Sequence, residues 1–319
     1  MATQQMLIKE LDSFSAEPCV LQSRVAACTP IVVGLDGTDT GRGAAALSLK
    51  LSRAWDAPVR VVSALEPDRC GWDRAAEWPR CAARERARRD VLTRFAARAA
   101  AEGINCDIDI DDGCAVTRLV DCAMSSRAEL VVVGLCARTE HAPVFCDDTA
   151  LRLIRRLTIP VLAVTPEVSE QPRRAIAAID FSPASTAAAR AALKVLQPGG
   201  TLLLAHLPPD FTSAASRADG VESSYARATS FALERLTREL APRCMSIAAV
   251  QLEGTLVEGL AALANDADAD LIAIGTGRRD LSTCYGVSHP ATALLHQRRR
   301  TILAVPAPKR SRERLFVHA

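Results

Sequence analysis

Two glycine-containing loops carry the residue types that could hold a phosphate group. One follows the apolar run 129–134, and the other follows the apolar run 270–275. Backbone N–H groups of such a loop, with a helix N-terminus behind them, form a site for anions. The second loop has the more suitable residues, which are Gly275, Gly277, Gly286, Ser288 and His289. Arg278 and Arg279 could neutralise phosphate charge there, although a simple turn explains the glycines equally well.

The first loop is less suited to a phosphate. Gly134 is followed by residues 135–137 without a second glycine, and two adjacent carboxylates, Asp147 and Asp148, precede the next helical pattern. Carboxylates favour a free helix N-terminus, but they repel a triphosphate. We therefore expect Asp147 and Asp148 to begin a helix and not to bind a metal or a nucleotide.

The two loops belong to a sequence repeat. Gly134 and Gly275 are 141 positions apart, and so are Pro160 and Thr301, which begin the last apolar run of each unit. A chain of 319 residues has the length of two ordinary domains. We predict an extension at 1–29, a first domain at 30–166, a linker at 167–174, a second domain at 175–306 and a basic tail at 307–319.

Apolar runs alternate with helical patterns in both units. The predicted strands are 31–35, 59–65, 106–110, 129–134 and 160–164, then 175–179, 201–206, 247–252, 270–275 and 301–305. This alternation predicts an α/β fold of two tandem doubly wound parallel sheets, which are Rossmann-like. Ligands of such sheets bind at the carboxyl ends of the strands. Asp36, Asp180, Gly134 and Gly275 should therefore face one crevice per domain, where either aspartate could contact a ligand or cap a helix.

Bulk composition excludes several classes of protein. A net charge of +2 does not indicate binding to nucleic acid or to an anionic membrane, and no apolar run is long enough to span a bilayer. The arginines of residues 84–98 are more typical of a solvated helix face than of a nucleic-acid site, because acidic residues lie among them. The 11 cysteines form no C-x-x-C pair, so we expect buried thiols in a cytoplasmic protein, with Cys136 and Cys146 the most accessible.

The chain resembles the universal stress protein family in a tandem two-domain form. The residues that carry the resemblance are 35–38 (Leu-Asp-Gly-Thr), 179–182 (Ile-Asp-Phe-Ser), 160–164 (Pro-Val-Leu-Ala-Val) and 301–305 (Thr-Ile-Leu-Ala-Val). The resemblance implies an adenine-nucleotide alpha hydrolase-like fold. It also implies that the last strands of the two domains, 161–164 and 302–305, pair to form an internal pseudo-dimer. Whether whole chains form a homodimer is left open.

The resemblance also implies where ATP would bind. Some members of the family bind ATP through a G-x-x-G loop followed by Gly-Ser or Gly-Thr, and both loops here depart from that pattern. We expect ATP in the second domain if it binds at all. Asp180 would lie near the adenosine, and Gly275, Gly277, Gly286, Ser288 and His289 would surround the phosphates. Asp36 and Gly134 are the weaker candidates of the first domain.

Three functions are compatible with these residues. The preferred one is a regulatory stress-response protein that acts through an unknown protein partner, since no P-loop, G-x-S-x-G or H-E-x-x-H motif is present. The alternative is an ATP-binding module with weak hydrolysis at most. A nucleotidyl-transfer enzyme is disfavoured, because residues 34–39 lack the required Ser-Gly-Gly-x-Asp-Ser loop. His206 could line an adenine pocket, but a buried histidine with satisfied hydrogen bonds is the simpler interpretation.

Overall fold

A computed structural model describes residues 29–65, 74–135, 149–209, 221–241, 245–277 and 290–308. The first half of the chain contains β1 (Ile31–Gly34), η1 (Asp39–Gly41), α2 (Arg42–Trp55), β2 (Val59–Leu65), α3 (Arg74–Ala101), β3 (Cys106–Asp112), α4 (Ala115–Ser125), β4 (Leu130–Gly134), α5 (Thr149–Arg156) and β5 (Val161–Val164). The second half contains β6 (Arg174–Ala178), α6 (Pro183–Val195), β7 (Thr201–His206), α7 (Val221–Leu240), β8 (Ser246–Gln251), α8 (Leu256–Asp266), β9 (Leu271–Thr276), α9 (Pro290–Gln297) and β10 (Thr301–Pro306).

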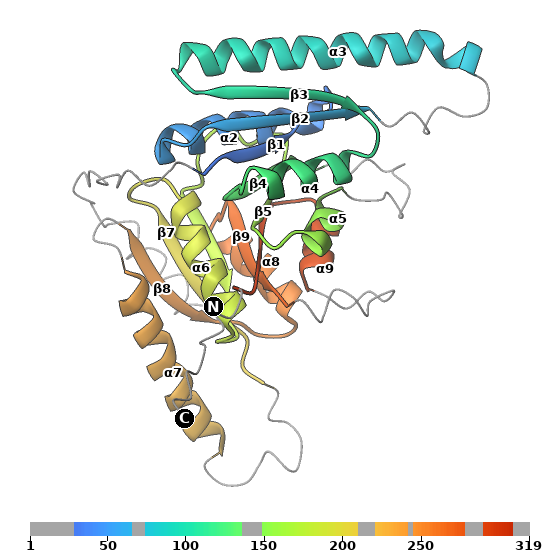
Figure 1. The fold of residues 1–319 in the computed structure, drawn as a ribbon. Helices are drawn as coiled ribbons and strands as arrows, with labels where there is room; N and C mark the ends of the chain where they lie inside the picture. Colours follow the sequence, from blue (N-terminus) through green and yellow to red (C-terminus); the bar gives the residue numbers. More distant parts are fainter. Residues whose placement is uncertain are drawn as a thin grey trace, which may run out of the picture.

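All ten of these strands form a single sheet (Figure 1). The order is β3-β2-β1-β4-β5-β10-β9-β6-β7-β8, so each half contributes five neighbouring strands in the same relative order. Every pair within a half is parallel, and only the central pair, β5 with β10, is antiparallel. The prediction of two tandem doubly wound parallel sheets is confirmed.

The central strand pair relates the two halves by a local two-fold axis. Leu162 lies opposite Leu303 in the register, and these two residues are themselves 141 positions apart. A pair in which equivalent residues face each other is the mark of an isologous contact. Both side chains are fully buried. The predicted pseudo-dimer through 161–164 and 302–305 is therefore confirmed, and it removes two exposed sheet edges.

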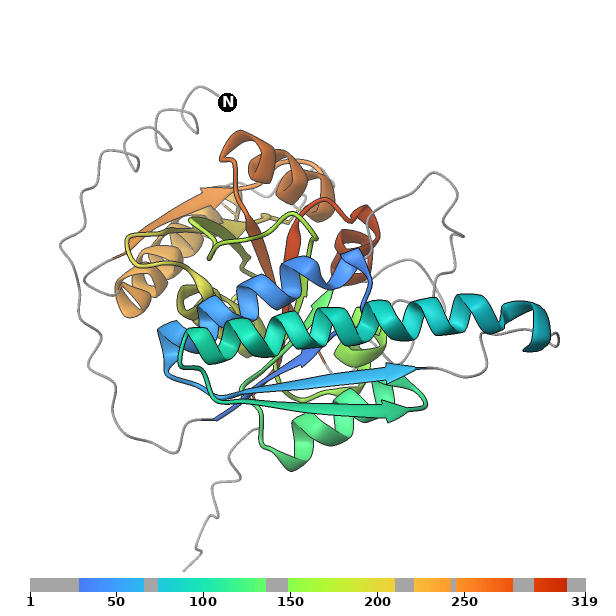
Figure 2. The same cartoon turned by 90° about the horizontal axis from the view of Figure 1, so that it is seen from above.

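Helices cover both faces of the sheet, as they must when parallel strands are apolar on both sides (Figures 1 and 2). One apolar cluster packs α2, α3, α6 and α7 against one face of the strands. The other packs α4, α5, α8 and α9 against the opposite face. None of the described helices is long and apolar enough to cross a membrane.

The structure corrects two local expectations and refines a third. The strand predicted at 106–110 is two residues longer, since Asp111 and Asp112 are the last residues of β3. Arg88, expected on a solvated helix face, is buried, whereas the neighbouring Arg86 and Arg89 are exposed. In addition, residues 39–41 form the 3-10 helix η1, so the α-helix α2 begins only at Arg42.

Three of the cysteines in the described ranges are placed well enough for their side chains to be described, and none of the three is in a disulfide. Cys106, Cys114 and Cys122 are free and half-buried. Cys136 and Cys146 lie outside the described residues. Burial raises the pKa of Cys106 and Cys122, so these two thiols are protonated near neutral pH.

Candidate functional site

The carboxyl ends of β1 and β6 carry equivalent aspartate turns. Asp36 Oδ1 accepts hydrogen bonds from the backbone N–H of Thr38 at 3.0 Å and from its hydroxyl at 2.7 Å. Asp180 Oδ1 accepts one from the backbone N–H of Ser182 at 2.9 Å. Each carboxylate thus holds the chain where it turns from strand to helix, as aspartate side chains commonly do.

The turn at Asp180 continues into a capped helix. Ser182 Oγ accepts from the N–H of Ser185 at 3.1 Å, and Pro183 occupies the first turn of α6. A serine N-cap followed by a first-turn proline is a favourable start for a helix. Partial burial acts to raise the pKa of Asp180, but hydrogen bonds from Ser182 and Ser185 outweigh it, and the pKa lies below its usual range. Asp180 is therefore an ionised acceptor at neutral pH and a poor general base.

Gly134 and Gly275 allow the helix after the first strand of each half to pack closely. A Cβ on Gly134 would lie 2.2 Å from the carbonyl oxygen of Thr40. A Cβ on Gly275 would lie 2.5 Å from the carbonyl carbon of Ala184. Neither approach leaves room for a side chain, so both glycines have a packing role that is independent of any ligand.

A serine and a histidine perform the same task in the two halves. Ser63 Oγ donates to the carbonyl of Leu35 at 2.5 Å, and His206 Nδ1 lies 2.7 Å from the carbonyl of Ile179. Leu35 and Ile179 are the residues that immediately precede the two aspartates. A carbonyl oxygen can only accept, so His206 carries its proton on Nδ1. The interpretation of His206 as a buried histidine with satisfied hydrogen bonds is confirmed.

Aromatic side chains surround His206 in the second crevice. Its Nε2 lies 2.9 Å from the hydroxyl of Tyr225, and the ring of Phe181 packs against it with centroids 5.0 Å apart. Phe181 has a φ of +63°, a left-handed conformation that is unusual for a bulky residue. Gly37 occupies the equivalent position of the first half with a φ of +81°. The second crevice therefore ends in an aromatic cluster that the first crevice lacks.

A buried arginine distinguishes the first crevice. The backbone of Arg88 on α3 lies against Gly37, since a Cβ on that glycine would lie 2.5 Å from the Cα of Arg88. The Arg88 side chain is 3% exposed, and its Nε forms an ion pair with Glu85 at 3.3 Å. Within the described part of the chain, neither Nε nor Nη1 has a hydrogen-bond partner. The equivalent residue on α7, 141 positions later, is the buried Thr229.

The structure brings some of the predicted site residues together. Asp36 and Gly134 line one small cavity of about 110 Å³ at the carboxyl ends of β1 and β4, with Thr40, Gly41 and Thr149. Asp180 and Gly275 both contact the start of α6. Gly277 follows β9 at the same edge of the sheet. The predicted residues that lie outside the described part of the chain are Gly286, Ser288, His289, Arg278, Arg279, Asp147 and Asp148.

Contact of any of these residues with a nucleotide stays a prediction. In the described residues, no three histidine, cysteine, aspartate or glutamate side chains are grouped closely enough to hold a metal ion. The sequence interpretation overlooked Ser63, Arg88 and Tyr225. Ser63 is a polar residue inside an apolar strand, which is a detectable signal, whereas Arg88 is one of eight arginines in the same helix.

The fold and its paired crevices define a tandem protein of two doubly wound α/β domains joined at their last strands. The model of the universal stress protein family matches residues 28–165 and again residues 172–296. The chain therefore belongs to the universal stress protein family. No curated protein matches the sequence significantly.

Solved structures show the same architecture. A universal stress protein from Archaeoglobus fulgidus is 13% identical, with 89% of this chain and 100% of that chain covered and a TM-score of 0.66. A protein of unknown function from Pseudomonas aeruginosa PAO1 is 14% identical, with 88% and 93% covered and a TM-score of 0.54. A universal stress protein solved in complex with cAMP is 24% identical over 44% of this chain and 100% of its own, with a TM-score of 0.34.

Proposed function

We propose that this chain is a non-catalytic regulatory protein of the stress-response type, which acts by binding a protein partner. The observation that carries the proposal is that the acid, base and hydroxyl groups described at the two crevices are already engaged in holding the fold. Asp36 and Asp180 accept from their own turns, and Ser63 and His206 bond the carbonyls before them. A general base or nucleophile needs a free group within reach of a substrate.

The lowered pKa of Asp180 supports the same conclusion. A carboxylate is an effective general base when its pKa lies near the working pH, and that of Asp180 is displaced in the opposite direction. His206 cannot take up a proton on Nδ1, because it already carries one there and donates it to Ile179. Its Nε2 is occupied by Tyr225.

The proposal is tested by turnover of ATP with the full chain at stoichiometric concentration. In the presence of magnesium, we expect ATP to be hydrolysed no faster than in a control without protein. The matched variant is His206→Ser, which places in the second half the residue type of the first. ADP or AMP formed in proportion to the wild-type protein, and lost in His206→Ser, would overturn a non-catalytic function.

Binding of a nucleotide without turnover is a second candidate. The sequence predicts it in the second half, at Asp180, Gly275 and Gly277, with Gly286, Ser288 and His289. The buried Arg88 favours the first crevice instead, because among the described residues its charge is offset by Glu85 alone and two of its nitrogens find no hydrogen-bond partner there. A buried cation of this kind favours an anion nearby.

Titration calorimetry with ATP and magnesium distinguishes the two crevices. If the second half binds ATP, Gly277→Asp abolishes the heat and Arg88→Met leaves it unchanged. If the first crevice binds an anion, Arg88→Met abolishes the heat and Gly277→Asp does not. If the wild-type protein gives no heat, it does not bind ATP, and the regulatory function does not involve this nucleotide.

A further inference from the structure

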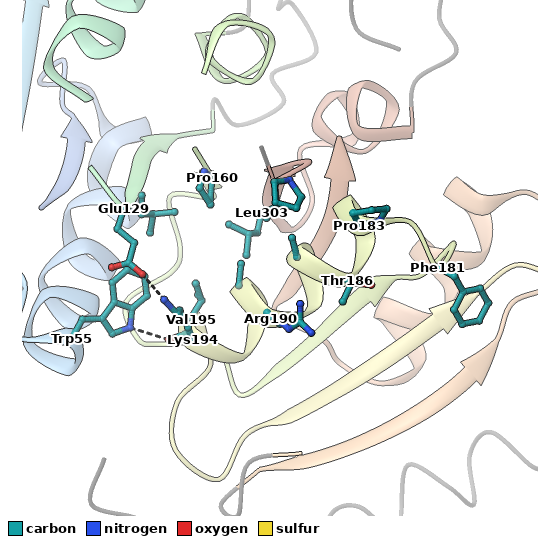
Figure 3. Close-up of a pocket in the computed structure, with 15 residues that line it drawn as sticks. Trp55, Glu129, Pro160, Phe181, Pro183, Thr186, Arg190, Lys194, Val195 and Leu303 are labelled. Carbon is teal, nitrogen blue, oxygen red and sulfur yellow. Dashed lines mark hydrogen bonds and ion pairs between the residues drawn. The ribbon is translucent and has the colours of Figure 1, made fainter. Parts of the chain in front are cut away.

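A cavity crosses the boundary between the two halves and continues along α6 to Pro183 and Phe181, beside the second crevice (Figure 3). This seam groove has a volume of about 630 Å³. Its apolar lining comes from both halves, namely Trp55, Leu130, Pro160, Ala191, Val195 and Leu303. Cavities of this size are large enough for a small ligand or for several side chains of a peptide segment.

Two polar contacts bridge the halves at one end of the seam groove. Trp55 Nε1 donates to the carbonyl of Lys194 at 3.0 Å, and the Lys194 ammonium pairs with Glu129 at 2.5 Å (Figure 3). The pKa of Glu129 is acted on first by burial, which raises it, but hydrogen bonds from Lys194 and Thr29 lower it overall. This end of the groove is therefore held by an ionised carboxylate.

The local two-fold axis relates the seam groove, beside α6, to an equivalent position beside α2. That equivalent position is occupied by another part of the chain. Lys50 on α2 is the equivalent of Lys194 on α6, 144 positions later. The chain that joins β5 to β6, residues 165–173, runs along this position. Arg42 Nε donates to the carbonyl of Pro166 at 3.3 Å, and Lys50 pairs with Glu170 at 2.9 Å.

The filled position is tightly packed. Pro166 is buried, and a Cβ on Gly43 of α2 would lie 2.0 Å from the carbonyl oxygen of Thr165. The equivalent of Gly43 on α6 is Ala187, which lines the seam groove. An alanine at this position has no room for a carbonyl as close as that of Thr165 is to Gly43.

The described chain reaches the seam groove from two sides. Pro308, which follows β10, lines it. Thr29, which precedes β1, donates from its hydroxyl to Glu129 in the groove wall at 2.9 Å. The two-fold axis places the equivalent of the connection 165–173 in the seam groove, between Pro308 and Thr29. A segment continuous with one of these two residues is therefore the counterpart of that connection.

We infer that the seam groove binds the residues that precede Thr29, namely 20–28, as an intramolecular strap across the two halves. These residues precede β1 as Glu170 and Gln171 precede β6, and both of the latter make contacts with helices at this boundary. Val20, Leu21 and Val25 supply apolar side chains for an apolar groove. Residues 1–28 lie outside the described part of the chain.

Charge and length favour this segment over residues 309–319. Four of those eleven residues are lysine or arginine, and they would face Arg190 and Lys194 of α6 in the groove. Residues 20–28 carry a single charged side chain, Arg24. Nine extended residues span up to about 30 Å, whereas the 13-residue helix α6 is about 20 Å long, so the segment can follow the whole groove.

Limited proteolysis of the full chain tests the inference. Trypsin cleaves after Arg24, and a bound segment is protected in proportion to the time it spends in the groove. Ala191→Trp fills the groove, and we expect cleavage after Arg24 to be about fivefold or more faster than in the wild type. Ala226→Trp, on an exposed position of α7, is the matched control and should cleave at the wild-type rate.

A second variant keeps the test decisive if Ala191→Trp does not fold. Val20→Asp combined with Leu21→Asp changes only the segment, and it should accelerate cleavage after Arg24 to the same extent. Equal cleavage in all four proteins would overturn the inference. Acceleration confined to residues 309–314, conversion of a dimer to a monomer by Ala191→Trp, or a small molecule retained by the native wild-type protein would each overturn it in favour of another occupant.

Discussion

The two crevices of this protein share one frame and finish it with different side chains. In both, an aspartate holds the turn after the first strand, and a glycine lets the following helix approach. The carbonyl before the aspartate is then bonded by Ser63 in the first half and by His206 in the second. The difference shows that the carbonyl at this position receives a hydrogen bond in both halves, and that side chains as different as serine and histidine can donate it.

The surroundings of that donor have also diverged. The first crevice has Gly37 and the buried Arg88, whereas the second has Phe181, Tyr225 and Thr229. One crevice thus keeps a charge that is only partly compensated, and the other keeps an aromatic cluster.

The largest expected change in stability comes from substituting the glycines that let a helix pack closely against the sheet in each half. Gly134→Ala and Gly275→Ala should each reduce the free energy of unfolding by about 2–3 kcal/mol, because the new methyl group meets backbone atoms that cannot yield easily. Urea unfolding measures this. Gly254→Asn is the control, since that glycine has no neighbour within 4 Å and asparagine accepts its positive φ. Equal stability of all three variants would show that the helices are not closely packed.

The equivalent left-handed positions should respond unequally. Gly37→Ala meets the backbone of Arg88 and should cost about 2 kcal/mol. Phe181→Gly relieves a left-handed phenylalanine but loses its contact with His206, so the two effects nearly cancel and the change should stay below about 1 kcal/mol. Thermal unfolding of both variants measures the difference. A larger cost for Phe181→Gly than for Gly37→Ala would contradict the comparison.

Exchange of the donor should sharpen the comparison further. His206→Ala leaves the carbonyl of Ile179 without its partner in a buried position and should cost about 1–3 kcal/mol. His206→Ser introduces the donor that the first half uses, so it should recover part of this loss. Chemical unfolding of the two variants gives the values. A serine variant no more stable than the alanine variant would mean that the halves do not share this requirement.

The smallest expected effect is on the stability of the protein at acidic pH. Because the pKa of Asp180 is lowered in the folded protein, its ionised form stabilises the fold above the ordinary pKa of about 4, and this contribution is lost as the pH falls through the lower folded-state value. Solvent screening should keep the contribution below about 1 kcal/mol. Asp180→Asn should therefore flatten the dependence of the free energy of unfolding on pH below about 4. An unchanged slope would show that Asp180 is not a structural acceptor.

The architecture could be predicted from the sequence because it depends on local signals that recur. Apolar runs predicted the strands, and the spacing of 141 positions between the two last units identified the duplication. The pairing of the last strands, with Leu162 opposite Leu303, was expected from the resemblance to the family. The sites were less accessible. That Arg88 is buried depends on which side of α3 faces Gly37, and this follows from packing between elements distant in the sequence. The seam groove likewise exists only once two halves are joined.

The protonation of His206 tests the central claim, that the polar groups at the strand ends hold the fold and perform no chemistry. Nitrogen-15 NMR of the full chain distinguishes the two ring nitrogens directly. We predict that Nδ1 carries a proton and donates it to the carbonyl of Ile179, and that Nε2 is hydrogen-bonded to the hydroxyl of Tyr225. An Nδ1 without a proton, or a ring that exchanges freely with solvent, would contradict the account.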